Sequence, residues 1–206
     1  MLKVLPAALT ALLLIVGCTP QAPRDRGLNS AQASVAWSRH QATIAEIEGF
    51  LITGRVASAE LDLRADLRWL QQSDRYFELR LAGPFGAGAV ELRGDPSQVE
   101  VRSGDGVEQT ASPEAWIRQR YGWTLPIAGL RYWALGIPDP AAPSQPVLDA
   151  QGRLASLVQN GWTLTYSEYK REGEYDLPRK FEADNGRIKL KLLIDRWTTT
   201  PTFRAP

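Results

Sequence analysis

The sequence predicts an α+β protein built on one curved antiparallel sheet, with helices inserted in the middle of the chain. After residue 49, apolar and charged residues alternate with a period of two in several segments, which is typical of antiparallel strands with one dry and one wet face. The segment 112–136 breaks this alternation and carries helix signals. The chain has 206 residues, 44% of them hydrophobic, which is enough for one domain with a sizeable core.

The N-terminal segment is typical of an export signal. A short basic start, Met1–Lys3, precedes an apolar run from Val4 to Val16 that is too short to span a bilayer. The run ends at Gly17 and Cys18, and Ile15–Cys18 resembles the bacterial lipobox, in which the cysteine becomes the acylated first residue. The alternative is a cleaved signal peptide that happens to contain a cysteine. Because Cys18 is the only cysteine, lipidation explains it better, and we expect a signal peptide over residues 1–17 and lipid attachment at Cys18.

Residues 18–33 are polar and contain Pro and Gly, which favours a flexible tether. Acyl chains on Cys18 would hold the protein on a phospholipid membrane, since each buried methylene contributes about 0.8 kcal/mol. Thr19, rather than Asp, follows the cysteine. By resemblance to the Gram-negative sorting rule, this favours the outer membrane over the inner one. The chain carries no basic block, so we expect no nucleic-acid partner.

A single domain is expected over residues 34–206. It begins with a helix over 34–48, with Ser34 as N-cap and with Val35, Trp37, Ile44 and Ile47 on one side. The alternating pattern then predicts strands within 61–69, 77–81, 90–93 and 99–102, with turns at 94–96 and 103–106.

The sequence in the middle of the domain predicts two helices. Ser112 and Pro113 are a helix start, as N-cap and first helical residue, and a second helical stretch runs from Ile127 to about Gly136. A proline-rich loop is expected over 138–146, and strands resume within 154–159, 162–167 and 188–194.

No catalytic chemistry is evident. The one histidine, His40, has polar neighbours and is expected on the surface. One histidine and one lipidated cysteine leave no His/Cys metal site and no Ser-His or Cys-His nucleophile. The carboxylates alternate with apolar residues along strands, which places most of them in water. We therefore predict a protein without catalytic residues, metal or cofactor, and a periplasmic hydrolase with paired carboxylates is the weakest alternative.

The aromatic residues are more informative. Five tryptophans are expected on inward faces: Trp69, Trp116, Trp123, Trp133 and Trp162. They could fill an ordinary core, or line a cavity between a curved sheet and two helices. The pattern itself leaves both arrangements open.

Several segments, in this order, resemble the LolB family of outer-membrane lipoproteins: Trp37–His40, Trp69–Gln71, Leu81-x-Gly83-Pro84-x-Gly86, the string from Gly122-Trp123-x-Leu125-Pro126-Ile127 through Leu130, Trp133 and Gly136 to Pro138, Gly152–Leu154, Gln159–Trp162, Leu177-Pro178 and Lys189-Leu190. The match covers nearly all of the chain behind the lipobox. It implies an unclosed antiparallel β-barrel covered by helices around a hydrophobic cavity. By this resemblance the cavity residues would be Leu67, Trp69, Leu79, Leu81, Leu92, Trp116, Trp123, Leu130, Trp133, Trp162 and Leu164.

The resemblance also implies a function. A lipid-anchored monomer facing the periplasm would accept acylated lipoproteins from the carrier LolA and insert them into the inner leaflet of the outer membrane. The loop Gly83-Pro84-Phe85-Gly86 would be the membrane insertion loop, with Phe85 where the family commonly has leucine. The alternative from another class is a lipoprotein scaffold for envelope assembly, with a solid core and a partner-binding face.

Overall fold

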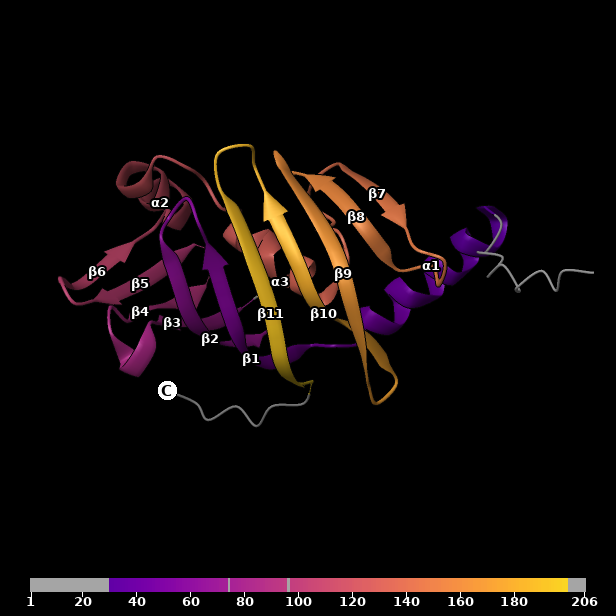
Figure 1. Ribbon diagram of the computed structural model, residues 1–206, viewed down its shortest axis with the longest axis horizontal. Coiled ribbons are helices and arrows are strands. Elements are labelled where there is room, and N and C mark those ends of the chain that lie inside the picture. The colour runs from indigo at the N-terminus through magenta and orange to yellow at the C-terminus, as the bar shows by residue number, and fades with distance from the viewer. Residues whose placement is uncertain (1–29, 74, 96, 200–206) are drawn as a thin grey trace, which may run out of the picture.

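The computed structural model describes residues 30–73, 75–95 and 97–199, and this part of the chain forms one eleven-stranded antiparallel sheet with three α-helices (Figure 1). The strands are β1 (Gly49–Ser58), β2 (Leu63–Gln72), β3 (Tyr76–Ala82), β4 (Val90–Asp95), β5 (Gln98–Ser103), β6 (Gly106–Thr110), β7 (Ser144–Leu148), β8 (Leu154–Gln159), β9 (Trp162–Glu172), β10 (Tyr175–Asp184) and β11 (Lys189–Thr198). The predicted fold class is confirmed.

The strand order is β6-β5-β4-β3-β2-β1-β11-β10-β9-β8-β7. The first and last strands therefore pair in the centre of the sheet, while β6 and β7, from the middle of the chain, form its two edges. The helices α2 (Pro113–Tyr121) and α3 (Ile127–Leu135) connect these two edges. The connection runs across the inner side of the curved sheet, so the sheet is covered there without being closed (Figure 1).

Apolar residues meet across neighbouring strands on the inner face. Trp69 of β2 is opposite Leu79 of β3, which is opposite Leu92 of β4. Leu67 is likewise opposite Leu81, because a step of two residues returns to the same face of a strand. The clean alternation in the sequence thus becomes a continuous apolar surface under the helices.

The first helix differs from the expectation. α1 spans Ser30–Ala45, so it begins four residues before Ser34, inside the segment expected to be tether. Val35 is 61% exposed, whereas Ile44 and Ile47 are buried. The N-terminal part of the helix extends beyond the end of the sheet (Figure 1), whereas Trp37 and the C-terminal end pack against the core. The expected signal peptide and Cys18 lie outside the described residues.

His40 is not the surface histidine expected from its polar neighbours. Its ring lies against Trp37, with centroids 6.0 Å apart, and its Nε2 atom is buried without a hydrogen-bond partner. Burial lowers the pKa of His40, and the nearby Arg153 acts in the same direction against Asp176 and Asp149.

Two further differences concern strands. β7 begins at Ser144, so the proline-rich loop is shorter than expected. β10 is not evident in the sequence, because Leu177 and Pro178 are adjacent and both buried. The pairing of β10 with β9 shifts register after Pro178, and such an irregularity interrupts the period of two.

Candidate functional site

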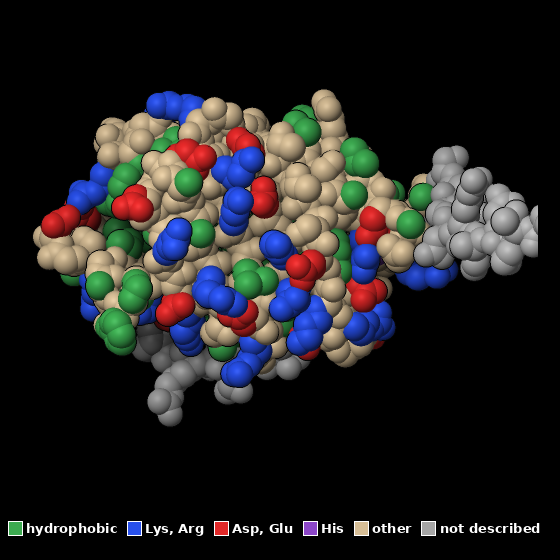
Figure 2. Space-filling model, viewed as in Figure 1, with side chains coloured by type: hydrophobic (Ala, Val, Ile, Leu, Met, Phe, Trp, Pro, Cys, Tyr) green, Lys and Arg blue, Asp and Glu red, His purple; other side chains and the backbone are tan. Residues whose placement is uncertain are grey.

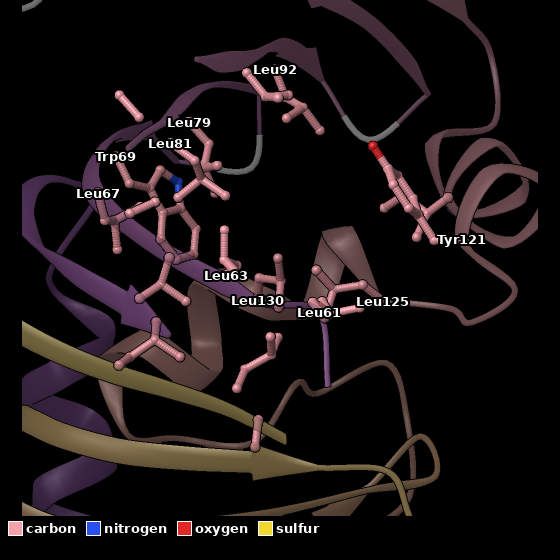
Figure 3. Close-up of a pocket in the computed structure, with 18 of the residues that line it drawn as sticks. Leu61, Leu63, Leu67, Trp69, Leu79, Leu81, Leu92, Tyr121, Leu125 and Leu130 are labelled. Atoms are coloured by element: carbon pink, nitrogen blue, oxygen red, sulfur yellow. The ribbon is translucent and has the colours of Figure 1, made fainter. Parts of the chain in front are cut away.

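An apolar cavity of about 510 Å³ lies between the inner face of the sheet and the helical segment 116–133. From the sheet, the predicted residues Leu67, Trp69, Leu79, Leu81 and Leu92 line it, and Trp116, Trp123, Leu130 and Trp133 line it from the helical segment. Figure 3 shows the first four of these strand residues gathered on one side of the space, with Tyr121 and Leu125 across from them. The inward register of the strands and the covering helices together create the hollow.

Trp162 and Leu164 do not line this cavity. Both are buried in β9, with exposed fractions of 2% and 0%. Trp162 lies against Trp133 and Trp123, with ring centroids 6.3 Å apart in each case. Their assignment to the cavity is therefore wrong, because helix α3 packs directly on this part of the sheet and fills the space.

Several lining residues were not predicted. Leu63 continues the inward alternation of β2, and Leu125 and Ile127 belong to the same motif as Trp123 and Leu130. These three positions could have been found from the sequence. Leu190 and Leu192 also line the cavity from β11, which could not be known without the pairing of β1 with β11.

The cavity wall offers few polar groups. Trp69 Nε1 donates to Gln71 Oε1 at 3.0 Å, Trp116 Nε1 to Glu108 Oε2 at 2.8 Å and Trp133 Nε1 to Gln159 Oε1 at 2.8 Å. These indoles contribute apolar ring surface while their N–H groups are already bonded. Such a wall suits a ligand without polar atoms, since a polar group placed there would lose its hydrogen bonds to water.

The cavity opens between the β1–β2 turn, the β3–β4 connection and the C-terminal end of α2. Lining residues at this mouth are exposed, among them Asp62, Ala87, Gly88 and Tyr121. At the other end of the cavity, Trp69, Phe77 and Trp133 are buried. The cavity therefore has one open end and one closed end.

The β3–β4 connection carries the predicted insertion loop. Pro84–Gly86 form a short 3₁₀ turn, closed by hydrogen bonds from Gly83 N to Ala87 O at 2.8 Å and from Gly86 N to Gly83 O at 2.9 Å. Phe85 has a φ of 58°, a conformation that non-glycine residues rarely adopt and that is concentrated at functional sites.

The Phe85 side chain is 110% exposed, so it makes no packing contact that would stabilise this conformation. Figure 2 shows hydrophobic side chains at the end of the molecule where this loop lies. Gly83 and Ala87, which flank the turn, line the cavity. The loop thus presents an uncovered aromatic ring beside the mouth.

Helix α2 packs over the cavity through the buried residues Pro113 and Ile117, and it also makes polar contacts at the surface. Arg120 pairs with Asp105 at 2.8 Å and with Glu108 at 3.3 Å, and Arg187 Nη1 donates to the carbonyl oxygen of Gly122 at 2.7 Å. Exposed ion pairs of this kind contribute only about 0–1 kcal/mol. These polar contacts therefore add little to the stabilisation that α2 gains from burying Pro113 and Ile117.

Within the described ranges, no group of three or more His, Cys, Asp or Glu residues could hold a metal ion. Among the helices of the same residues, none is long and apolar enough to cross a membrane.

Comparison with known proteins gives a consistent result. The family model "Outer membrane lipoprotein LolB" matches residues 48–197. Outer-membrane lipoprotein LolB of Stutzerimonas stutzeri is 34% identical over 90% of this chain and 90% of its own length, and that of Nitrosococcus oceani is 36% identical over 92% and 94%. A solved outer-membrane lipoprotein-sorting protein domain from Vibrio parahaemolyticus is covered over 93% of its length by 82% of this chain, at a TM-score of 0.47 and 8% identity. The family match and the two relatives show that this chain belongs to the LolB family of outer-membrane lipoproteins.

Proposed function

We propose that this protein accepts acylated lipoproteins from the periplasmic carrier LolA and inserts them into the inner leaflet of the outer membrane. In this proposal Cys18 carries the lipid anchor, the protein acts as a monomer facing the periplasm, and no covalent chemistry takes place. The observation that carries the proposal is the apolar cavity whose mouth lies beside the exposed Phe85.

The cavity suits acyl chains on energetic grounds. A methylene moved from water into an apolar environment gains about 0.8 kcal/mol, so a long acyl chain exposed in the periplasm would be strongly unfavourable. The wall is mostly aromatic rings and leucines, and among the tryptophans of the described ranges only Trp123 has a buried N–H without a hydrogen-bond partner. A carrier can then release its cargo without nucleotide hydrolysis, provided that this site binds the acyl chains more tightly than the carrier does.

The loop at the mouth suits the second step. Burying a large apolar side chain contributes about 1.5–3 kcal/mol, so insertion of Phe85 into lipid would bring the mouth of the cavity to the membrane surface. The strained backbone of the turn holds the ring outward before any membrane is present. An acyl chain leaving the cavity would then pass directly into the bilayer.

The test uses the chain from residue 18 onward with Cys18→Ala, which retains every described residue. It is mixed with LolA loaded with a radiolabelled lipoprotein, and the cargo on each protein is measured after separation. We expect the cargo to move to this protein. Retention of all cargo on LolA would contradict the receptor role and favour the scaffold.

A matched pair of variants locates the cargo. Leu79→Asp places a charge inside the cavity, whereas Arg80→Asp places the same side chain on the exposed face of the same strand. Leu79→Asp should lower the amount of bound cargo at least tenfold, on the order of a lost 1.4 kcal/mol or more. Arg80→Asp should accept cargo normally. Equal effects of the two variants would show that the cargo binds elsewhere.

A further inference from the structure

Gln71 is the polar side chain at the closed end of the cavity. It lines the cavity wall but is only 6% exposed. It lies on the same face of β2 as Leu63, which lines the cavity at the open end. The two positions are separated by eight residues, or about 26 Å of strand at about 3.3 Å per residue. The cavity therefore runs along β2 from its mouth to Gln71.

The pairing of the strands shows that Gln71 belongs to a closing row of side chains. Across the sheet, Phe50 of β1 is opposite Gln71, which is opposite Phe77 of β3. Phe50 is fully buried and lies outside the cavity lining, while Gln71 and Phe77 face the cavity. This row is the boundary between the hollow and the packed core behind it.

A glutamine is an unusual member of such a row, and its amide is fixed on both sides. Gln71 Oε1 accepts from Trp69 Nε1 at 3.0 Å, and Gln71 Nε2 donates to the carbonyl oxygen of Ser73 at 2.6 Å. An aliphatic side chain at this position could change rotamer when a ligand presses against it. Gln71 could do so only by leaving buried hydrogen-bonding groups without partners, which is costly.

We infer that Gln71 is the residue that sets the length of acyl chain the cavity accepts. An acyl chain enters at the mouth, runs along β2 and ends against the fixed amide of Gln71. This inference rests on the proposed function and names the selectivity of that same cavity: a saturated chain that reaches Gln71 binds best, and further methylenes remain outside.

The test measures chain-length dependence in the Cys18→Ala chain. Saturated fatty acids from decanoic to eicosanoic acid displace the fluorescent fatty acid cis-parinaric acid. Affinity should rise about fourfold with each methylene, the equivalent of about 0.8 kcal/mol, and then stop rising at a limiting length. Gln71→Ala should move this limit upward by about two methylenes, because it vacates the closed end.

Two further variants make the result specific. Gln71→Met keeps the size of the side chain but removes its hydrogen bonds, so affinity should level off over a broader range of chain lengths. This variant tests the inference even if Gln71→Ala does not fold. Leu63→Ala, on the same face of the same strand at the mouth, should weaken binding of all chains and leave the limit unchanged. An unchanged limit in the Gln71 variants would overturn this inference alone. Failure of every fatty acid to bind the parent protein would overturn the proposed function as well.

Discussion

The two halves of the sheet carry the same alternating pattern of side chains but bury it in different ways. In the half formed by β2, β3 and β4, the inward residues Leu79, Leu81 and Leu92 are only partly buried and face the cavity. In the half formed by β8 and β9, the inward residues Leu157 and Leu164 are completely buried. One half is hollow and the other is filled.

The difference comes from the helices. Trp133 of α3 fills the space above β9, where its Nε1 donates to Gln159 and its carbonyl oxygen accepts from the Tyr166 hydroxyl at 2.9 Å. Gln159 also donates to the carbonyl oxygens of Asp139 and Ala142, which fixes the segment after α3. Helix α2, over the hollow half, buries only Pro113 and Ile117, and its other contacts include exposed polar ones at Arg120 and Gly122. The filled half is therefore rigid, whereas the hollow half can take up a ligand.

Removal of a leucine from each half should give the largest contrast. Leu164→Ala should destabilise the protein by about 2–5 kcal/mol, because it creates a cavity in packed surroundings. Leu79→Ala should cost about 1 kcal/mol or less, since Leu79 already borders empty space. Urea unfolding at equilibrium measures both values. Similar costs for the two variants would mean that the hollow half is packed like the other.

The exposed apolar residues of the two halves provide the next contrast. Phe85→Glu should leave the melting temperature unchanged and reduce the transfer of bound cargo into liposomes about tenfold to a hundredfold, because insertion of the ring is lost. Val147→Glu, at the 58% exposed position on the far edge strand, is the control and should transfer normally. A large loss of stability in Phe85→Glu, or transfer at the parent rate, would rule out the insertion role.

The attachment of α2 should control how quickly the hollow half fills. Arg120→Ala removes the pairs with Asp105 and Glu108 and should speed acyl-chain binding about fivefold, as expected for about 1 kcal/mol. Stopped-flow tryptophan fluorescence follows the rate, because four tryptophans line the cavity. Arg118→Ala, an exposed position on the same helix without these pairs, serves as the control. Identical rates in both variants would show that α2 does not limit entry.

The smallest expected effect concerns α1, beside the filled half. His40 has a lowered pKa in the folded state because of burial, so the unfolded chain binds a proton more readily. Stability should therefore be fully present above the ordinary histidine pKa of about 6.5 and decline as the pH falls below it. His40→Gln should flatten this part of the pH profile in thermal melts. A profile unchanged by the substitution would show that His40 does not titrate on unfolding.

Much of this architecture could be predicted from local patterns. The alternation around Trp69 and Leu79, and the helix start at Ser112 and Pro113, appear where they were expected. The resemblance of its loop marks Phe85 as a candidate for membrane insertion but does not decide whether the ring is exposed or tucked under the sheet, and the structure shows it exposed.

The distinction between hollow and filled could not be predicted. Leu164 and Leu79 occur in the same alternating pattern, and only the position of Trp133 above the sheet separates them. The role of Gln71 at the closed end likewise depends on its neighbours across two other strands. Contacts between segments far apart in the chain decide both features, and a period of two contains no information about them.

The most direct test of the account is to ask which tryptophans sense an acyl chain. The indole N–H signals of the seven tryptophans can be followed by NMR while a triacylated lipopeptide is added to the Cys18→Ala chain. The signals of Trp69, Trp116 and Trp123, which line the hollow half, should shift. Those of Trp37 on α1 and Trp197 on β11 should not change. Shifts confined to Trp37 and Trp197, or no shift at all, would contradict an acyl-binding cavity.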